Sequence, residues 1–103
     1  MSICSSLSDD GNDLTITIQG PFNFSTQQEF RDAYEKVTGS PKTYTINLEE
    51  TTTLDNSALG LLLMLRDYAG TRSDSVRLIN CNENVIGLFS ICNFEQLFSI
   101  ETF

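Results

Sequence analysis

The chain contains no histidine. Histidine is the commonest general base and metal ligand, so its absence removes Ser–His and Cys–His nucleophile pairs and most metal sites. The phosphate-binding motif G-x-x-x-x-G-K-[ST] and the dinucleotide motif G-x-G-x-x-G are also absent. Neighbouring acids such as those at 9–10 and 49–50 lie in polar stretches typical of solvated surface. We therefore expect a protein that is not an enzyme and that holds no cofactor and no metal.

Positive charge is scarce. Six Lys and Arg residues stand against 14 Asp and Glu residues, which gives a formal net charge of −8, and the basic residues form no run. Such a surface repels nucleic-acid phosphates and anionic lipid, because both require clustered cations. We therefore expect no direct contact with nucleic acid and none with a membrane.

Long apolar runs and export signals are missing as well. The longest apolar run, 58–65, is far too short to cross a bilayer. Residues 1–13 are polar and acidic, unlike a signal peptide. The three cysteines are odd in number and widely spaced, which fits neither a disulfide framework nor a zinc site. These features predict a cytoplasmic protein.

Hydrophobic periodicity predicts alternating strands and helices. Apolar and polar residues alternate over 14–18, which predicts a half-buried strand that Gly20-Pro21 ends. Ser25 followed by Gln28 fits a capping box, and an apolar stripe over 30–37 predicts a helix that Gly39 ends.

The second half of the chain continues the alternation. We expect a strand at 43–48, a loop at 49–54, a helix at 57–69, a strand at 76–79, a helix at 85–92 capped by Asn82, and a strand at 97–100. This order favours a mostly parallel sheet with right-handed crossovers, and residues 2–6 are expected to add an edge strand. The prediction is one α/β domain over residues 1–103, with a sheet of four or five strands and helices packed on it.

The helix predicted at 57–69 is apolar around nearly its whole circumference. Such a helix needs cover on more than one side, from its own sheet and from a partner. Gly60 in its first turn costs about 1 kcal/mol relative to alanine, which suggests close packing or the close approach of another group.

Ser57 lies where this helix begins, at the carboxyl edge of the predicted sheet, where ligands and partners commonly bind. One interpretation is structural: the side chain is the N-cap and accepts from backbone N–H groups. The other is a phosphorylation switch, because a phosphate there would meet free N–H groups and the positive end of the helix dipole. It would add roughly −1.5 to −2 charge beside Asp55, so a partner covering this edge is expected to lose binding.

Three segments resemble the STAS domain family, and more closely the bacterial anti-sigma factor antagonists. Residues 46–48 and 54–60 resemble the family's strand followed by Asp-Ser-Ser-Gly-Leu-Gly, and 18–23 resembles its strand-Gly-x-Leu-Asp turn. Residues 85–98 resemble the family's helix with Leu-Phe pairs before the last strand. The resemblance covers nearly the whole chain in order.

The resemblance implies that Ser57 is the phosphoacceptor and Asp55 its neighbouring acid. Unphosphorylated, the protein would bind an anti-sigma factor with a histidine-kinase-like serine kinase domain and so free a sigma factor. That partner would phosphorylate Ser57 with ATP, and a PP2C-like phosphatase would reverse the step. The implied partner-binding residues are Asn23, Asp55, Asn56, Ser57, Ala58, Leu59 and Gly60. Asn23 replaces the family's Asp, and Asn56 and Ala58 replace its Ser and Gly.

Two other functions stay open. The chain could be a STAS scaffold subunit of a transporter or of a lipid-trafficking ATPase, in which case Ser57 is only a cap. Alternatively, it could be a nucleotide or small-ligand sensor with a pocket near Asn23 and Ser57.

Overall fold

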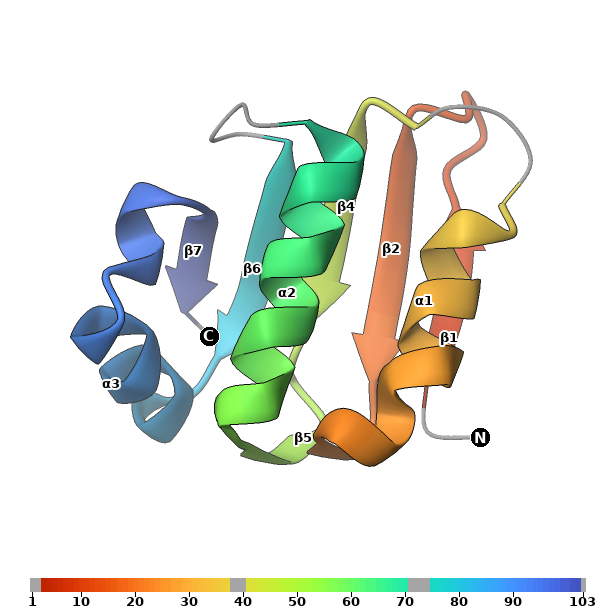
Figure 1. The fold of residues 1–103 in the computed structure, drawn as a ribbon. Coiled ribbons are helices and arrows are strands. Elements are labelled where there is room, and N and C mark those ends of the chain that lie inside the picture. The colour runs from red at the N-terminus through yellow and green to blue at the C-terminus, as the bar shows by residue number, and fades with distance from the viewer. Residues whose placement is uncertain (1–2, 38–40, 71–74, 103) are drawn as a thin grey trace.

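A five-stranded sheet forms the centre of the computed structural model, which describes residues 3–37, 41–70 and 75–102. The strands in sheet order are β1 (Ile3–Leu7), β2 (Asp13–Ile18), β4 (Thr43–Asn47), β6 (Val76–Cys81) and β7 (Ser99–Thr102). β1 runs antiparallel to β2, and the other neighbours are parallel (Figure 1). The predicted mostly parallel sheet with an N-terminal edge strand is confirmed.

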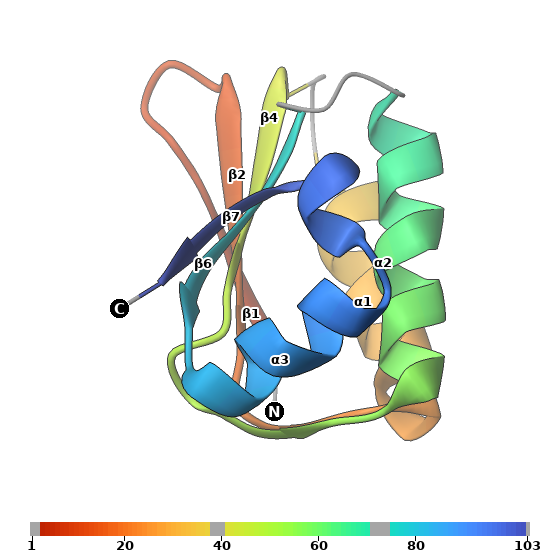
Figure 2. The same ribbon diagram turned by 90° about the vertical axis from the view of Figure 1, so that its left-hand side faces the viewer.

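The helices cover one face of this sheet, so the fold has two layers (Figure 2). They are α1 (Gln27–Glu35), α2 (Asn56–Ala69) and α3 (Glu83–Ile91), with the short 3₁₀ helices η1 (Phe24–Thr26) and η2 (Phe94–Gln96). Each α-helix connects strands of the parallel sheet, as a crossover must. The predicted order of strands and helices is confirmed.

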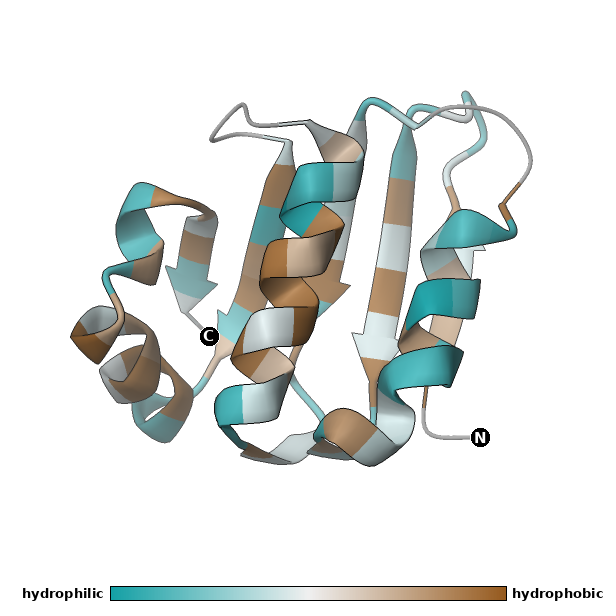
Figure 3. Cartoon of the chain, viewed as in Figure 1, coloured by the Kyte–Doolittle hydropathy of each residue, from teal (hydrophilic) through white to brown (hydrophobic). Residues whose placement is uncertain are grey.

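The core lies between the two layers and follows the two periodicities of the sequence. Alternate residues of β2 point toward the helices, and Leu14, Ile16 and Ile18 are fully buried. From α1 the buried side chains are Phe30 and Tyr34, as its apolar stripe predicts. Figure 3 shows the resulting alternation of apolar and polar bands along the strands. Each side chain buried in this way contributes about 1.5–3 kcal/mol.

A second, two-stranded sheet lies at the lower end of the fold as drawn in Figure 1, and it was not predicted. β3 (Gly20–Phe22) and β5 (Thr51–Leu54) pair in parallel. β2 does end before Gly20-Pro21, as predicted, but these residues begin a new strand. The prediction of a loop over 49–54 is wrong for residues 51–54, which form β5. The buried Thr51 hydroxyl donates to the carbonyl of Ile18 at 2.9 Å and ties this small sheet to β2. β3 has three residues and β5 has four, which is too few for the alternation of apolar and polar residues to be recognised in the sequence.

The start of the first helix also differs from its prediction. Ser25 is not the N-cap: it lies inside η1, the 3₁₀ turn that precedes α1, and Asn23 caps that turn. The Asn23 side chain accepts from the backbone N–H of Ser25 at 2.9 Å and forms a capping box with Thr26, which is itself the N-cap of α1. α1 then begins at Gln27 and ends at Glu35, whereas Gly39 lies outside the described residues.

The third helix and the last strand lie closer to their predicted positions. Asn82 caps α3 as predicted, accepting from the backbone N–H of Val85 at 2.9 Å. The last strand begins at Ser99, two residues later than predicted, because η2 and its C-cap Leu97 occupy the preceding positions.

Candidate functional site

The N-termini of two helices, η1 and α2, lie side by side at the carboxyl ends of β3 and β5. Phe22 and Leu54 are paired across the small sheet, and the residues that follow them directly are Asn23 and Asp55. Asn23 caps η1 and Asp55 caps α2. The turn of η1 and the strand β5 lie next to each other at the lower end of Figure 1. Non-local strand pairing therefore brings together two segments that are distant in the sequence.

Asp55 is the N-cap of α2, so the interpretation of Ser57 as the cap is wrong. The backbone of Asp55 is extended (φ −108°, ψ −177°), and its carboxylate accepts from the Ala58 N–H at 3.1 Å. α2 begins at Asn56, one residue before the predicted start, which makes Ser57 its second residue. The Ser57 hydroxyl instead donates to the Asp55 carboxylate at 2.6 Å. This leaves the hydroxyl oxygen without a capping role.

Hydrogen bonds keep the Asp55 side chain ionised. The Ser57 hydroxyl is the main cause that lowers the pKa of Asp55 below its ordinary value of 3.8, and the Ala58 N–H adds to it. A full negative charge consequently lies beside Ser57 at neutral pH. A phosphate on this serine would replace the O–H donor by an anion next to another anion.

The predicted partner-binding residues differ in exposure. Asp55, Asn56 and Gly60 are exposed, whereas Asn23 and Ser57 are half-buried. Ala58 and Leu59 point into the core, with 0% and 7% of their surfaces exposed. The side chains of Ala58 and Leu59 therefore hold α2 on the sheet and are not available to a partner.

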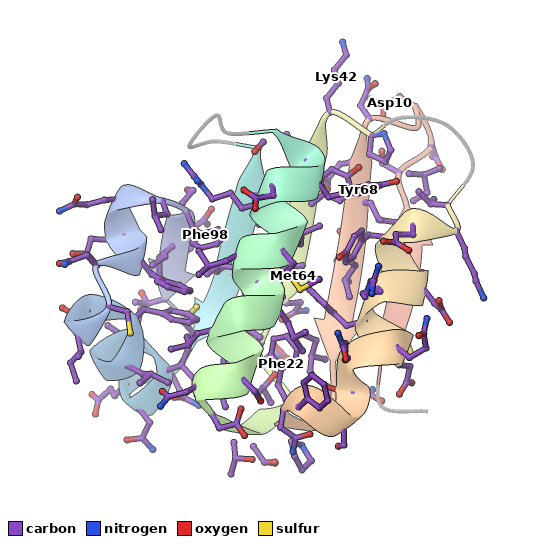
Figure 4. The ribbon with its side chains drawn as sticks, in the orientation of Figure 1. Asp10, Phe22, Lys42, Met64, Tyr68 and Phe98 are labelled. Carbon is purple, nitrogen blue, oxygen red and sulfur yellow. The ribbon has the colours of Figure 1, made fainter. Side chains whose placement is uncertain are left out.

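Exposed apolar side chains adjoin Ser57, and these were not singled out in the sequence. Ser57, Gly60 and Met64 lie at the spacing of one helical face, and Leu63 and Met64 are 38% and 41% exposed. Phe24 of η1, which packs against α2, is 64% exposed. In Figure 4, Met64 lies on the flank of α2 toward α1. We call Phe24, Ser57, Gly60, Leu63 and Met64 the α2 face.

The α2 face is open, and the segments that carry it contain no Lys or Arg. A Cβ added at Gly60 would meet no atom within 4 Å, so the chain itself does not use the space that this glycine leaves. Residues 11–30 and 43–65 contain no Lys or Arg, although they carry several acids. The apolar circumference of α2, noted in the sequence, was the signal that could have located this face.

The remaining expectations concern ligands and membranes. A hollow of about 230 Å³ lies between β5 and α3, and neither Asn23 nor Ser57 lines it. Among the described residues, no group of three His, Cys, Asp or Glu side chains is placed to bind a metal ion. Within the same ranges, no helix combines the length and the apolarity that a bilayer crossing requires.

Comparisons with known proteins find a family match over most of the chain. The family profile described as Mlab, STAS domain matches residues 5–100. A STAS-domain containing protein of Pseudomonas aeruginosa strain UCBPP-PA14 is 50% identical over 100 residues, which is 97% of this chain and 99% of that protein.

Solved structures share the fold at low identity. A candidate anti-sigma factor antagonist from Thermotoga maritima has a TM-score of 0.79 and 15% identity, covering 98% of this chain and 86% of that chain. The Bacillus cell fate determinant SpoIIAA in its phosphorylated form has a TM-score of 0.72 and 16% identity, covering 97% of this chain and 91% of that chain. A sulfate transporter family protein from Wolinella succinogenes has a TM-score of 0.72 and 14% identity, covering 91% of this chain and 80% of that chain. Because the profile spans well over half of the sequence, the chain belongs to the STAS domain family.

Proposed function

We propose that the chain is an anti-sigma factor antagonist, a non-enzymatic binding protein controlled by phosphorylation of Ser57. The observation that carries the proposal is the Ser57 hydroxyl, which is outside the core, is not a cap, and adjoins an exposed apolar helix face. The solved structure of SpoIIAA, described as an anti-sigma factor antagonist in its unphosphorylated form, supports it through the shared fold.

The partner proposed for the unphosphorylated protein is an anti-sigma factor with a histidine-kinase-like serine kinase domain. Its surface covers the α2 face, where Gly60 allows close approach and Phe24 and Met64 supply apolar contact. The same partner phosphorylates Ser57 with ATP, and a PP2C-like phosphatase restores the hydroxyl. These reactions place the protein in the cytoplasm, where ATP and the transcription machinery are found.

Charge explains why phosphorylation would release the partner. A phosphoserine adds roughly −1.5 to −2 charge at pH 7, and Asp55 already carries one negative charge at hydrogen-bond distance. A partner that covers the α2 face would have to desolvate both anions. Burying charge without a counter-charge is costly, so the complex is expected to dissociate.

Three variants test the proposal with the cognate anti-sigma factor and ATP. Ser57→Ala is expected to take up no phosphate and to stay bound, whereas Ser57→Asp is expected to bind more weakly in a pull-down. Thr52→Ala, which removes an exposed neighbouring hydroxyl, is the matched control and should behave like the natural protein. Phosphate incorporation into Ser57→Ala, measured by intact mass, would refute Ser57 as the acceptor.

A second candidate function is a scaffold subunit of a transporter, favoured by the shared fold of the Wolinella succinogenes protein. The same α2 face would then bind a transporter subunit constitutively. Met64→Lys is expected to break binding in both cases, whereas uptake of phosphate at Ser57 in the presence of the partner and ATP is expected only for the switch.

A further inference from the structure

The edge of the fold opposite β1 carries an apolar groove. Two adjoining hollows of about 640 and 300 Å³ lie between α3 and the end of the sheet, and both are lined by Ile86 and Ser90. Gly87 contributes to the larger hollow, and Phe89 and Ile100 contribute to the smaller one. We call these two hollows together the β7 groove. It shares no residue with the α2 face.

β7 borders this groove and has a free edge. Within the described residues β7 pairs with β6 alone, and Figure 2 looks onto its outer edge. Residues of a strand alternate in the direction of their N–H and C=O groups, so half of the β7 backbone faces outward. Ile100 pairs with the buried Leu78 and therefore points to the helix layer. A strand added beside β7 would thus direct its alternate side chains into the groove.

The acidic side chains around the groove favour a positively charged binding partner. Glu83 lies at the larger hollow and Glu95 at the smaller one, and no Lys or Arg lines either of them. A second copy of this chain carries the same net charge of −8 and the same acidic rim, so its approach is disfavoured by repulsion. A basic segment is attracted to the same rim.

We propose that β7 is a docking edge for an extended, basic peptide segment of a partner protein, with apolar residues at every second position. The segment adds to β7 as a further strand, through main-chain hydrogen bonds, and its apolar side chains fill the β7 groove. This is a second interaction surface, independent of Ser57 and its phosphorylation.

The test uses the full chain and an acetylated, amidated peptide of sequence Lys-Ile-Lys-Val-Lys-Ile-Arg. Amide hydrogen exchange should slow at alternate residues of β7 when the peptide binds, because only the outward N–H groups gain partners. NMR shifts should gather on β7 and α3. A peptide with Glu in place of each Lys and Arg should fail to bind.

Two glycine variants provide a matched pair. A Cβ at Gly87 or at Gly60 would meet nothing within 4 Å, so a side chain can begin at either site without a clash. Circular dichroism and the urea midpoint of each variant check that the fold is kept. Gly87→Leu fills the groove and should weaken peptide binding by roughly tenfold or more, about 1.4 kcal/mol. Gly60→Leu lies on the α2 face and should leave it unchanged.

In the peptide experiments, each of three results would overturn the proposal: peptide shifts on α2 instead of β7, equal binding of the acidic peptide, or no effect of Gly87→Leu. Concentration-dependent shifts at β7 in the protein alone would assign the edge to a second copy, and would also overturn it. None of these results bears on whether Ser57 accepts a phosphate.

Discussion

At the scale of single residues, the contact between Ser57 and Asp55 is the most informative one. In Ser57→Ala the pKa of Asp55 should rise toward its ordinary value, because the hydroxyl is the main group that lowers it. A carbon-detected NMR titration of the Asp55 carboxyl in both proteins measures the difference. An unchanged pKa would show that the hydrogen bond does not persist in solution.

The lowered pKa has a defined consequence for stability. A carboxyl whose pKa is lower in the folded state contributes stability that is present above its unfolded pKa and lost as the pH falls through the folded value. The stability advantage of the natural protein over Ser57→Ala should therefore be fully present above pH 3.8, the ordinary value for Asp55, and should shrink as the pH falls below it. Once the pH lies below the folded-state pKa of Asp55, the carboxyl is protonated in both proteins and this part of the difference should vanish.

The position of Ser57 near a helix start was predictable, but its role was not. Asp55, Asn56 and Ser57 are three consecutive residues that are all good N-caps. Apolar periodicity fixes a helix to within a residue or two and does not say which of the three has the extended backbone. The direction of the Ser57 hydroxyl toward Asp55 therefore needed the structure.

At the scale of elements, Gly60→Ala separates stability from binding. Gly60 is an exposed residue inside α2 with open space around it, so alanine should stabilise the protein by roughly 0.5–1 kcal/mol. Chemical denaturation measures this gain. If a partner packs closely against Gly60, its affinity should fall in the same variant.

Gly87→Ala is the control for that experiment, because Gly87 is an exposed glycine of α3 with equally open space. It should give a similar gain in stability without loss of binding at the α2 face. A loss of affinity in both glycine variants would contradict direct contact at Gly60.

The cap of α3 allows a second prediction for an element. Asn82→Ala removes the acceptor for the Val85 N–H and should cost about 1 kcal/mol of unfolding free energy. Urea denaturation at neutral pH measures it. Asn82→Asp keeps the acceptor, so equal destabilisation by both substitutions would contradict a capping role.

Most elements were predictable because their periods extend over five or more residues, as in β2 and α1. β3 and β5 were not, because each is short and gains its structure from the other, across about thirty intervening residues. Pro21 and Gly20 also suggested a break, although a short edge strand tolerates proline. The juxtaposition of Asn23 and Asp55 depends on this pairing, so that part of the candidate site could not be derived from local patterns.

At the scale of the whole molecule, the net charge of −8 should make stability depend on salt. Acidic side chains repel one another, and raising the ionic strength to roughly 0.15 M screens that repulsion. Urea midpoints in dilute buffer and with added NaCl should therefore rise with salt. A fall would mean that attractive pairs such as Arg77–Glu101 outweigh the repulsion.

The small parallel sheet joins the two polar caps mechanically. Because Phe22 and Leu54 belong to one ladder, a pull on the turn after β3 is transmitted to the first residue of α2 through main-chain bonds rather than through side chains. Loss of the pairing between β3 and β5 is therefore expected to displace both caps together. Under the proposed function, a partner that contacted the turn after β3 would therefore be expected to shift Ser57 as well.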